Sequence, residues 1–198
     1  SYNEEGQTTC IAPLSKAAFP IQARPLADLD RYPAYSRILT EQTEFGDMFL
    51  LQINRGCPYK CRFCHTGYTQ TPLRHLSYDM AARLVRQGLQ ERKRIGLVGA
   101  AIADYPALQE LCDLIASEGG KLSVSSLRLS AFAHTACLLE ALVHAGQKTV
   151  TFAPEAGTER LRRLIRKPLA DTVLYETVEH VIRQHIPNLK LYFLVGLP

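Results

Sequence analysis

Short apolar runs alternate along the chain with segments in which apolar residues recur every three or four positions. Short continuous runs are typical of buried strands, and the three-and-four spacing is typical of one face of a helix. The pattern predicts strands at residues 48–53, 95–99, 122–126, 149–153 and 189–195. Helices are expected between them.

Residues that begin or end helices bound these helical segments. Ser77 is a suitable N-cap for the first, Gly119 and Gly120 end the second, and Gly146 ends the third. Pro168 interrupts the fourth, because proline lacks the N–H that continues a helix. Strands and helical segments therefore alternate to the end of the chain.

This alternation predicts the α/β fold class. Strands separated by helices pair in parallel through right-handed crossovers, which gives a barrel, a part-barrel or an open doubly wound sheet. We expect a partial TIM-like (β/α) barrel, truncated after its fifth strand in a fragment of a longer protein, because the last apolar run reaches the final residues and the chain begins with Ser1. In such folds the chemistry lies at the carboxyl ends of the strands.

The chain divides into two segments of different composition. Residues 1–45 contain prolines at positions 13, 20, 25 and 33 and no sustained apolar period, so we interpret them as an irregular lead-in or interdomain linker. Residues 46–198 carry the strand and helix pattern. They form the expected core domain, incomplete at its C-terminus.

The composition excludes few classes of protein. Of the 198 residues, 46% are hydrophobic and 21% charged, as in a globular protein, and the net charge of +4 neither requires nor excludes a nucleic-acid partner. No apolar run approaches the roughly 18 residues of a membrane span, and the start lacks the pattern of a signal peptide. We expect a cytoplasmic protein without a membrane partner.

The cysteines indicate a metal site. Three of the six lie within eight residues, and the spacing of Cys57, Cys61 and Cys64 is C-x3-C-x2-C, directly after the first predicted strand. This spacing differs from the C-x2-C pairs of zinc ribbons and from the spacings of ferredoxins. The remaining cysteines stand far apart, which is typical of core or linker thiols. They are Cys10, Cys112 and Cys137.

A four-iron cubane held by three thiolates has one iron without a protein ligand. On Cys57, Cys61 and Cys64 such a cluster would leave that iron open to a small molecule, which a reaction centre needs and an electron-transfer site does not. A non-catalytic module in which the same thiolates hold zinc or an Fe–S group structurally is the alternative. We do not expect His65 to be a fourth ligand, because adjacent side chains diverge and it would fill the open iron.

With the aromatic Phe63 before its last cysteine, the motif resembles that of the radical SAM superfamily, and the resemblance extends over about residues 45–198. It implies a [4Fe–4S] cluster whose open iron binds S-adenosyl-L-methionine (SAM). The reduced cluster would pass one electron to SAM, yielding methionine and a 5′-deoxyadenosyl radical. An electron donor such as flavodoxin or ferredoxin is implied as well. The substrate and the final reaction are not, because the superfamily shares this step among many reactions.

Two glycines at later strand ends belong to the same resemblance. Gly99 stands where the family often has a glycine-rich turn whose backbone receives the SAM amino group, although the acidic residue of that turn is absent here. Gly196 stands where the backbone would meet the adenine. The alternative for Gly99 is a glycine that merely ends a strand.

Polar residues after the third and fourth predicted strands extend the resemblance further. Their segments resemble the branch of the superfamily that includes methylthiotransferases and proteins with a cobalamin-binding domain. Ser125, Arg128 and Glu155 would contact the ribose and methionine parts of SAM. Arg128 would pair with the methionine carboxylate and Glu155 would accept hydrogen bonds from ribose hydroxyls. Structural salt bridges are the alternative for both.

Two further features bear on the cofactors. Arg55, Lys60 and Arg62 surround the cysteines and would offset the negative charge of the cluster, or would form an ordinary solvated basic loop. The proline-rich lead-in resembles the connector that follows a cobalamin-binding domain. Cobalamin is therefore implied only for a longer parent protein.

Overall fold

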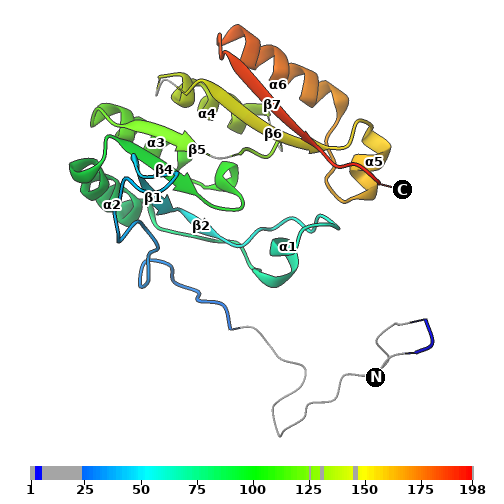
Figure 1. Ribbon diagram of the computed structural model, residues 1–198, viewed down its shortest axis with the longest axis horizontal. Coiled ribbons are helices and arrows are strands. Elements are labelled where there is room, and N and C mark those ends of the chain that lie inside the picture. The colour runs from blue at the N-terminus through cyan, green and yellow to red at the C-terminus, as the bar shows by residue number, and fades with distance from the viewer. Residues whose placement is uncertain (1–2, 6–23, 125, 130–131, 145–146, 198) are drawn as a thin grey trace, which may run out of the picture.

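A row of parallel strands forms the frame of the structure (Figure 1). The computed structural model describes residues 3–5, 24–124, 126–129, 132–144 and 147–197. One parallel sheet has the order β1-β4-β5. Its strands are β1 (Met48–Gln52), β4 (Arg94–Val98) and β5 (Lys121–Val124). A second parallel pair consists of β6 (Thr149–Glu155) and β7 (Asn188–Phe193).

A short bridge joins these two groups of strands. Leu127, just beyond the end of β5, pairs in parallel with Phe152 of β6, and its N–H donates to the Thr151 carbonyl over 3.0 Å. The parallel strands therefore follow one another in space in the order in which they occur in the chain. The five predicted strands are confirmed, with ends that shift by at most two residues.

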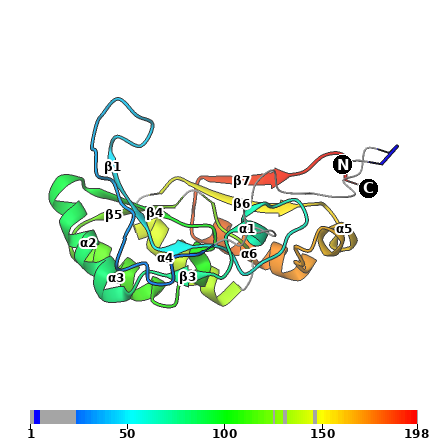
Figure 2. The same cartoon turned by 90° about the horizontal axis from the view of Figure 1, so that it is seen from below.

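The longer helices lie along one side of the strands, as Figure 2 shows. They are α2 (Tyr78–Glu91), α3 (Leu108–Ser117), α4 (Phe132–His144) and α6 (Asp171–Arg183). A 3-10 turn, η1 (Ile102–Asp104), precedes α3, and the short α5 (Glu159–Leu164) precedes α6. Parallel strands with helical crossovers on one side make a mixed α/β partial barrel, as predicted. No closed barrel forms within the described part of the chain.

The predicted helix ends are found where they can be observed. Ser77 is the N-cap of α2, and its side chain accepts a hydrogen bond from the Met80 N–H over 3.2 Å. Gly119 and Gly120 follow α3, and Pro168 lies between α5 and α6. Gly146 lies outside the described residues. No helix in those ranges is both long and apolar enough to cross a membrane.

Apolar side chains between helices and strands form the core. Phe49 and Leu51 of β1 and Ile95 of β4 are at most 1% exposed. Gly88 brings α2 directly onto the Phe49 ring, where a Cβ atom would overlap the ring carbons. Burial of these side chains is the main favourable term that holds the helix layer against the strands.

Three short elements around the cysteines were not predicted. β2 (Asn54–Arg55) and β3 (Arg74–His75) pair in antiparallel fashion, and α1 (Thr66–Thr69) lies between them. Elements of two to four residues are too short to show an apolar period. They nevertheless shape the site, because the β2–β3 pair holds together the two ends of the segment that contains the cysteines.

A buried arginine fastens the end of β6 to the helices that follow it. Arg162 is 0% exposed, and its Nε donates to the Leu169 carbonyl over 2.8 Å and its Nη1 to the Ala156 carbonyl over 3.0 Å. Its Nη2 forms an ion pair with Asp171 at the start of α6. The single side chain therefore links the residue after β6 to the segment that leads into α6.

We predict that Arg162→Met lowers the free energy of unfolding of the cofactor-free protein by about 1–3 kcal/mol, because it leaves carbonyl groups without a donor. Chemical denaturation measures the change. Arg163→Met is the matched control, since Arg163 has a 73% exposed side chain and its ion pair within the described structure is with Glu159 one turn away. Its expected effect is within about 0.5 kcal/mol. Equal effects of the two substitutions would contradict the assignment.

Candidate cofactor site

The cysteine loop begins with a glycine whose backbone no other residue could adopt without strain. Gly56 follows β2 with φ +90°, a region that L side chains rarely enter. A Cβ atom at this position would also overlap the Gln70 carbonyl and lie 2.7 Å from the Pro72 carbonyl. The chain can therefore turn from β2 into the loop only because this position has no side chain.

The rest of the loop is held by backbone contacts. Gly67 of α1 lies so close to the Tyr59 carbonyl that a Cβ atom would overlap it. The Arg62 N–H donates to the Ile165 carbonyl over 2.9 Å, which ties the loop to the end of α5. The segment between the second and third cysteines therefore lies beside the C-terminal end of α5, which comes about 100 residues later in the sequence.

The three cysteines lie on this loop as thiols outside any disulfide. Cys57 and Cys61 are buried, with 9% and 6% of their surface exposed, and Cys64 is half-buried. Among the described residues, no group of three or more His, Cys, Asp or Glu side chains is arranged around the position of a single metal ion. A cubane does not require such an arrangement, because each thiolate ligates a different iron. The donor set fits a three-thiolate cluster.

Burial raises the pKa of the Cys57 thiol. A hydrogen bond from the Tyr59 backbone and the positive charge of Arg128 oppose this rise, and the neighbouring Cys61 and Cys64 add to it. Cysteine must lose its proton to bind a metal. Arg128 and the Tyr59 amide therefore favour the form of Cys57 that a metal needs.

Arg128 lies against the cysteine loop. Its Nη1 donates to the Cys61 sulfur over 3.5 Å, and its guanidinium carbon lies 3.6 Å from the centre of the Tyr59 ring. The Tyr59 hydroxyl in turn donates to Asp104 Oδ1 over 2.7 Å. The Nε of Arg128 and the Oδ2 of Asp104 are buried and have no hydrogen-bond partner among the described residues. The structure thus brings Arg128 to the predicted ligands.

Gly99 lies at the end of β4 beside a buried amide. Asn54 is 0% exposed, its Nδ2 donates to the Ala101 carbonyl over 2.6 Å, and its Oδ1 lacks a hydrogen-bond partner in the described structure. A Cβ atom on Gly99 would overlap that Oδ1. The approach of Asn54 is by itself a sufficient reason for glycine at this position.

Glu155 ends β6 in an unusual backbone conformation. Its φ of +69° lies in the left-handed region, and the pairing register with β7 shifts between Phe152 and Glu155. Its carboxylate accepts a hydrogen bond from Lys167 Nζ over 2.8 Å, and both side chains are only 12% exposed. Strained backbone at a strand end is common in functional sites. One oxygen of this carboxylate is, however, already paired.

The other predicted site residues are less enclosed. Phe63 is 46% exposed, and Gly196, with φ +85°, is exposed and has open space around it. Ser125 lies outside the described residues. Lys60 and Arg62 are exposed, and Arg55 donates two hydrogen bonds to Gln52 Oε1, over 3.0 and 2.7 Å.

The remaining cysteines do not join the loop where they can be placed. Cys112 is buried in the apolar face of α3, 3% exposed, which agrees with its interpretation as a core thiol. Cys10 and the side chain of Cys137 fall outside the described part of the structure.

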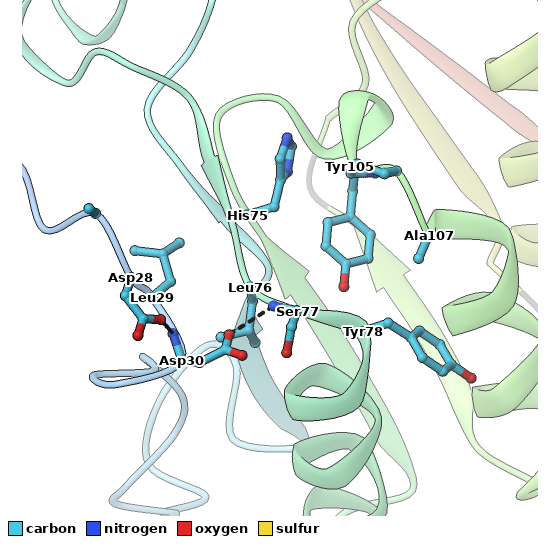
Figure 3. A pocket seen from close by; sticks show the side chains of 11 residues that line it. Asp28, Leu29, Asp30, His75, Leu76, Ser77, Tyr78, Tyr105 and Ala107 are labelled. Carbon is cyan, nitrogen blue, oxygen red and sulfur yellow. Dashed lines mark hydrogen bonds between the residues drawn. The ribbon is translucent and has the colours of Figure 1, made fainter.

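A cavity of about 400 Å³ lies on another part of the molecule, between the lead-in, the start of α2 and the loop before α3 (Figure 3). Burial raises the pKa of Tyr105 to about 12. Burial lowers the pKa of His75, against the opposing charge of Asp104. None of the predicted site residues lines this cavity.

Three residues near the site were not predicted from the sequence as site residues. Tyr59 contacts the predicted Arg128, Lys167 contacts the predicted Glu155, and Asp104 contacts Tyr59. Tyr59 lies between Cys57 and Cys61 in the sequence, and this position was the one feature that could have indicated that it belongs to the site. Asp104 and Lys167 follow their partners by 45 and 12 residues without any motif. Only the folded chain brings them to the site.

Comparison with known proteins settles the family. The sequence profile of the radical SAM superfamily matches residues 51–198. The chain belongs to the radical SAM superfamily. An uncharacterized protein from Methanocaldococcus jannaschii is 34% identical over 172 residues, which cover 86% of this chain and 37% of that relative. The chain thus spans little more than a third of the length of this relative.

Two solved structures share the partial-barrel fold. The cobalamin-dependent SAM radical enzyme OxsB, solved with aqua-cobalamin and SAM bound, has a TM-score of 0.56 and 16% identity over 73% of this chain and 23% of its own. Methylornithine synthase (PylB) has a TM-score of 0.50 and 15% identity over 77% of this chain and 47% of its own. At these identities the likeness concerns the fold alone.

We predict that Gly56→Ala opens the cysteine loop of this radical SAM chain and destabilises the fold by more than about 1 kcal/mol, because of the positive φ and the overlap with Gln70. Denaturation and the rate at which Cys57 and Cys61 react with a thiol reagent measure the change. Gly157→Ala is the control, since Gly157 has no atom within 4 Å of a Cβ position. Unchanged thiol reactivity in Gly56→Ala would contradict the prediction.

Proposed function

We propose that this chain is the core of a radical SAM enzyme, in which Cys57, Cys61 and Cys64 bind a [4Fe–4S] cluster. The bound cluster supplies one electron for the reductive cleavage of SAM to a 5′-deoxyadenosyl radical. The substrate of that radical is not part of the proposal. The chain's own residues hold the cofactors, orient SAM and exclude water.

One observation carries the proposal. Three cysteines lie on a single loop that follows β2, just beyond the first parallel strand β1, and no other residue type could replace Gly56 at its start without strain. In α/β folds, chemistry gathers at the carboxyl ends of such strands. Membership of the superfamily supports a [4Fe–4S] cluster as the metal group that these thiolates would hold.

The same edge of the strands supplies candidates for binding SAM. Glu155 ends β6, Gly99 directly follows β4, and Gly196 lies three residues beyond β7. Ser125 is proposed on sequence alone. Glu155 would use the carboxylate oxygen that Lys167 does not hold, and the ion pair with Lys167 would fix the position of the carboxylate. Phe63, half exposed, would cover the cluster from the solvent side.

The proposal concerns residues 46–198 as the core domain and residues 1–45 as a lead-in. Reduction would come from a protein donor such as flavodoxin or ferredoxin, in the cytoplasm. The activity of the whole protein is proposed only as far as the radical-forming step, since the chain spans 37% of its relative. Cobalamin is not assigned to any residue of this chain and would belong to a longer parent protein.

We predict that anaerobic reconstitution with iron and sulfide gives a brown protein with an Fe–S spectrum that changes when SAM is added. Cys57→Ala, Cys61→Ala and Cys64→Ala should each assemble no stable cluster, because a cubane held by two thiolates has lost one of its protein ligands. Iron and sulfide analysis and electron paramagnetic resonance measure the outcome.

Cys112→Ala serves as the control, since Cys112 is a core residue of α3 and should leave the cluster intact. A colourless protein that retains one zinc ion would favour the structural metal module instead. Full iron content in all three loop variants would refute the ligand assignment.

A further inference from the structure

A cation without a carboxylate partner lies on the proposed cluster ligands. Arg128 forms no ion pair with any carboxylate among the described residues, and its Nη1 instead donates to the Cys61 sulfur over 3.5 Å. A donor and a net positive charge next to a thiolate stabilise negative charge on that sulfur.

Two further residues fix the position of this guanidinium. The Tyr59 ring lies under it at 3.6 Å, and the Tyr59 hydroxyl donates to Asp104 over 2.7 Å. The cation–π contact on the face of the ring and the hydrogen bond from its hydroxyl together restrict the rotation of the Tyr59 side chain. Asp104 comes from η1, outside the cysteine loop, so it anchors the stack to the strand framework.

We propose that Arg128 sets the reduction potential of the cluster through its hydrogen bond to the Cys61 sulfur, and that Tyr59 and Asp104 are positioning residues for Arg128. The inference rests on the proposed function, because it requires the cluster. The cluster gains one electron from its donor and becomes more negative. A hydrogen bond and a positive charge at a ligand sulfur stabilise that reduced form and raise the potential.

This role differs from the one that the family resemblance implies for Arg128. Pairing with the methionine carboxylate acts only when SAM is bound, whereas the contact with Cys61 acts in its absence. Measuring the potential without SAM therefore separates the two roles. The buried Nε of Arg128 has no partner in the described structure, so both roles are compatible with its geometry.

The test is a redox titration of the reconstituted protein without SAM, followed by electron paramagnetic resonance. In Arg128→Met we expect the ratio of reduced to oxidised cluster at a fixed potential to fall about tenfold, which is about 59 mV for one electron. Tyr59→Phe, which keeps the ring and loses the bond to Asp104, should shift the potential in the same direction by less. Arg128→Lys, which keeps the charge, should recover part of the loss.

Arg94→Met is the matched control. Arg94 begins β4 at the opposite end of the strands and pairs with Asp47 over 3.1 Å, so its loss should leave the potential unchanged. Iron content is measured on every sample. If Arg128→Met assembles no cluster, the reduction potentials of Arg128→Lys and Tyr59→Phe are compared with that of the wild type instead.

The outcomes separate this inference from the proposed function. Wild-type protein without a cluster would refute the proposed function. Normal iron content with the same potential in wild type, Arg128→Met and Tyr59→Phe would overturn the inference alone. Weaker SAM binding in Arg128→Met at an unchanged potential would likewise overturn it, in favour of the carboxylate role.

Discussion

The shape of the cysteine loop depends on two places where the backbone passes another segment without room for a side chain. Gly56 and Gly67 occupy these places, the first against Gln70 and the second against Tyr59. Because loops have few buried apolar contacts, their conformation must come from local sterics and backbone hydrogen bonds. The pairing of β2 with β3 and the bond from Arg62 to Ile165 complete that restraint.

The charged groups around this loop are divided between two tasks. Arg162 and Asp171 belong to the framework, since the buried guanidinium satisfies carbonyl groups of the chain itself. Arg128 faces the cysteine sulfur and stacks on Tyr59, with no carboxylate partner among the described residues. Arg128 is half-buried and its Nε has no hydrogen-bond partner in the described structure, so its position against a cysteine sulfur is informative about what the site holds.

Glu155 shows how a framework contact and a site residue can coincide. It has a left-handed backbone and pairs with Phe193 of β7 after a register shift, and Lys167 holds its carboxylate. The alternatives of SAM contact and salt bridge are therefore not exclusive for this residue. A carboxylate held in place by a buried ammonium group is already oriented for a second hydrogen bond.

The sequence by itself determined the five strands, the helices between them and the three cysteines in their loop. Apolar periods and cap residues such as Ser77 report these features directly, because they depend on neighbours within a few positions. The motif was also sufficient to indicate the radical SAM superfamily. Tertiary structure alone decided that β2 pairs with β3, that Arg128 reaches Cys61, and that Asp104 and Lys167 fix their partners. Contacts between residues so far apart in the chain exist only after the parallel strands bring their carboxyl ends to one edge.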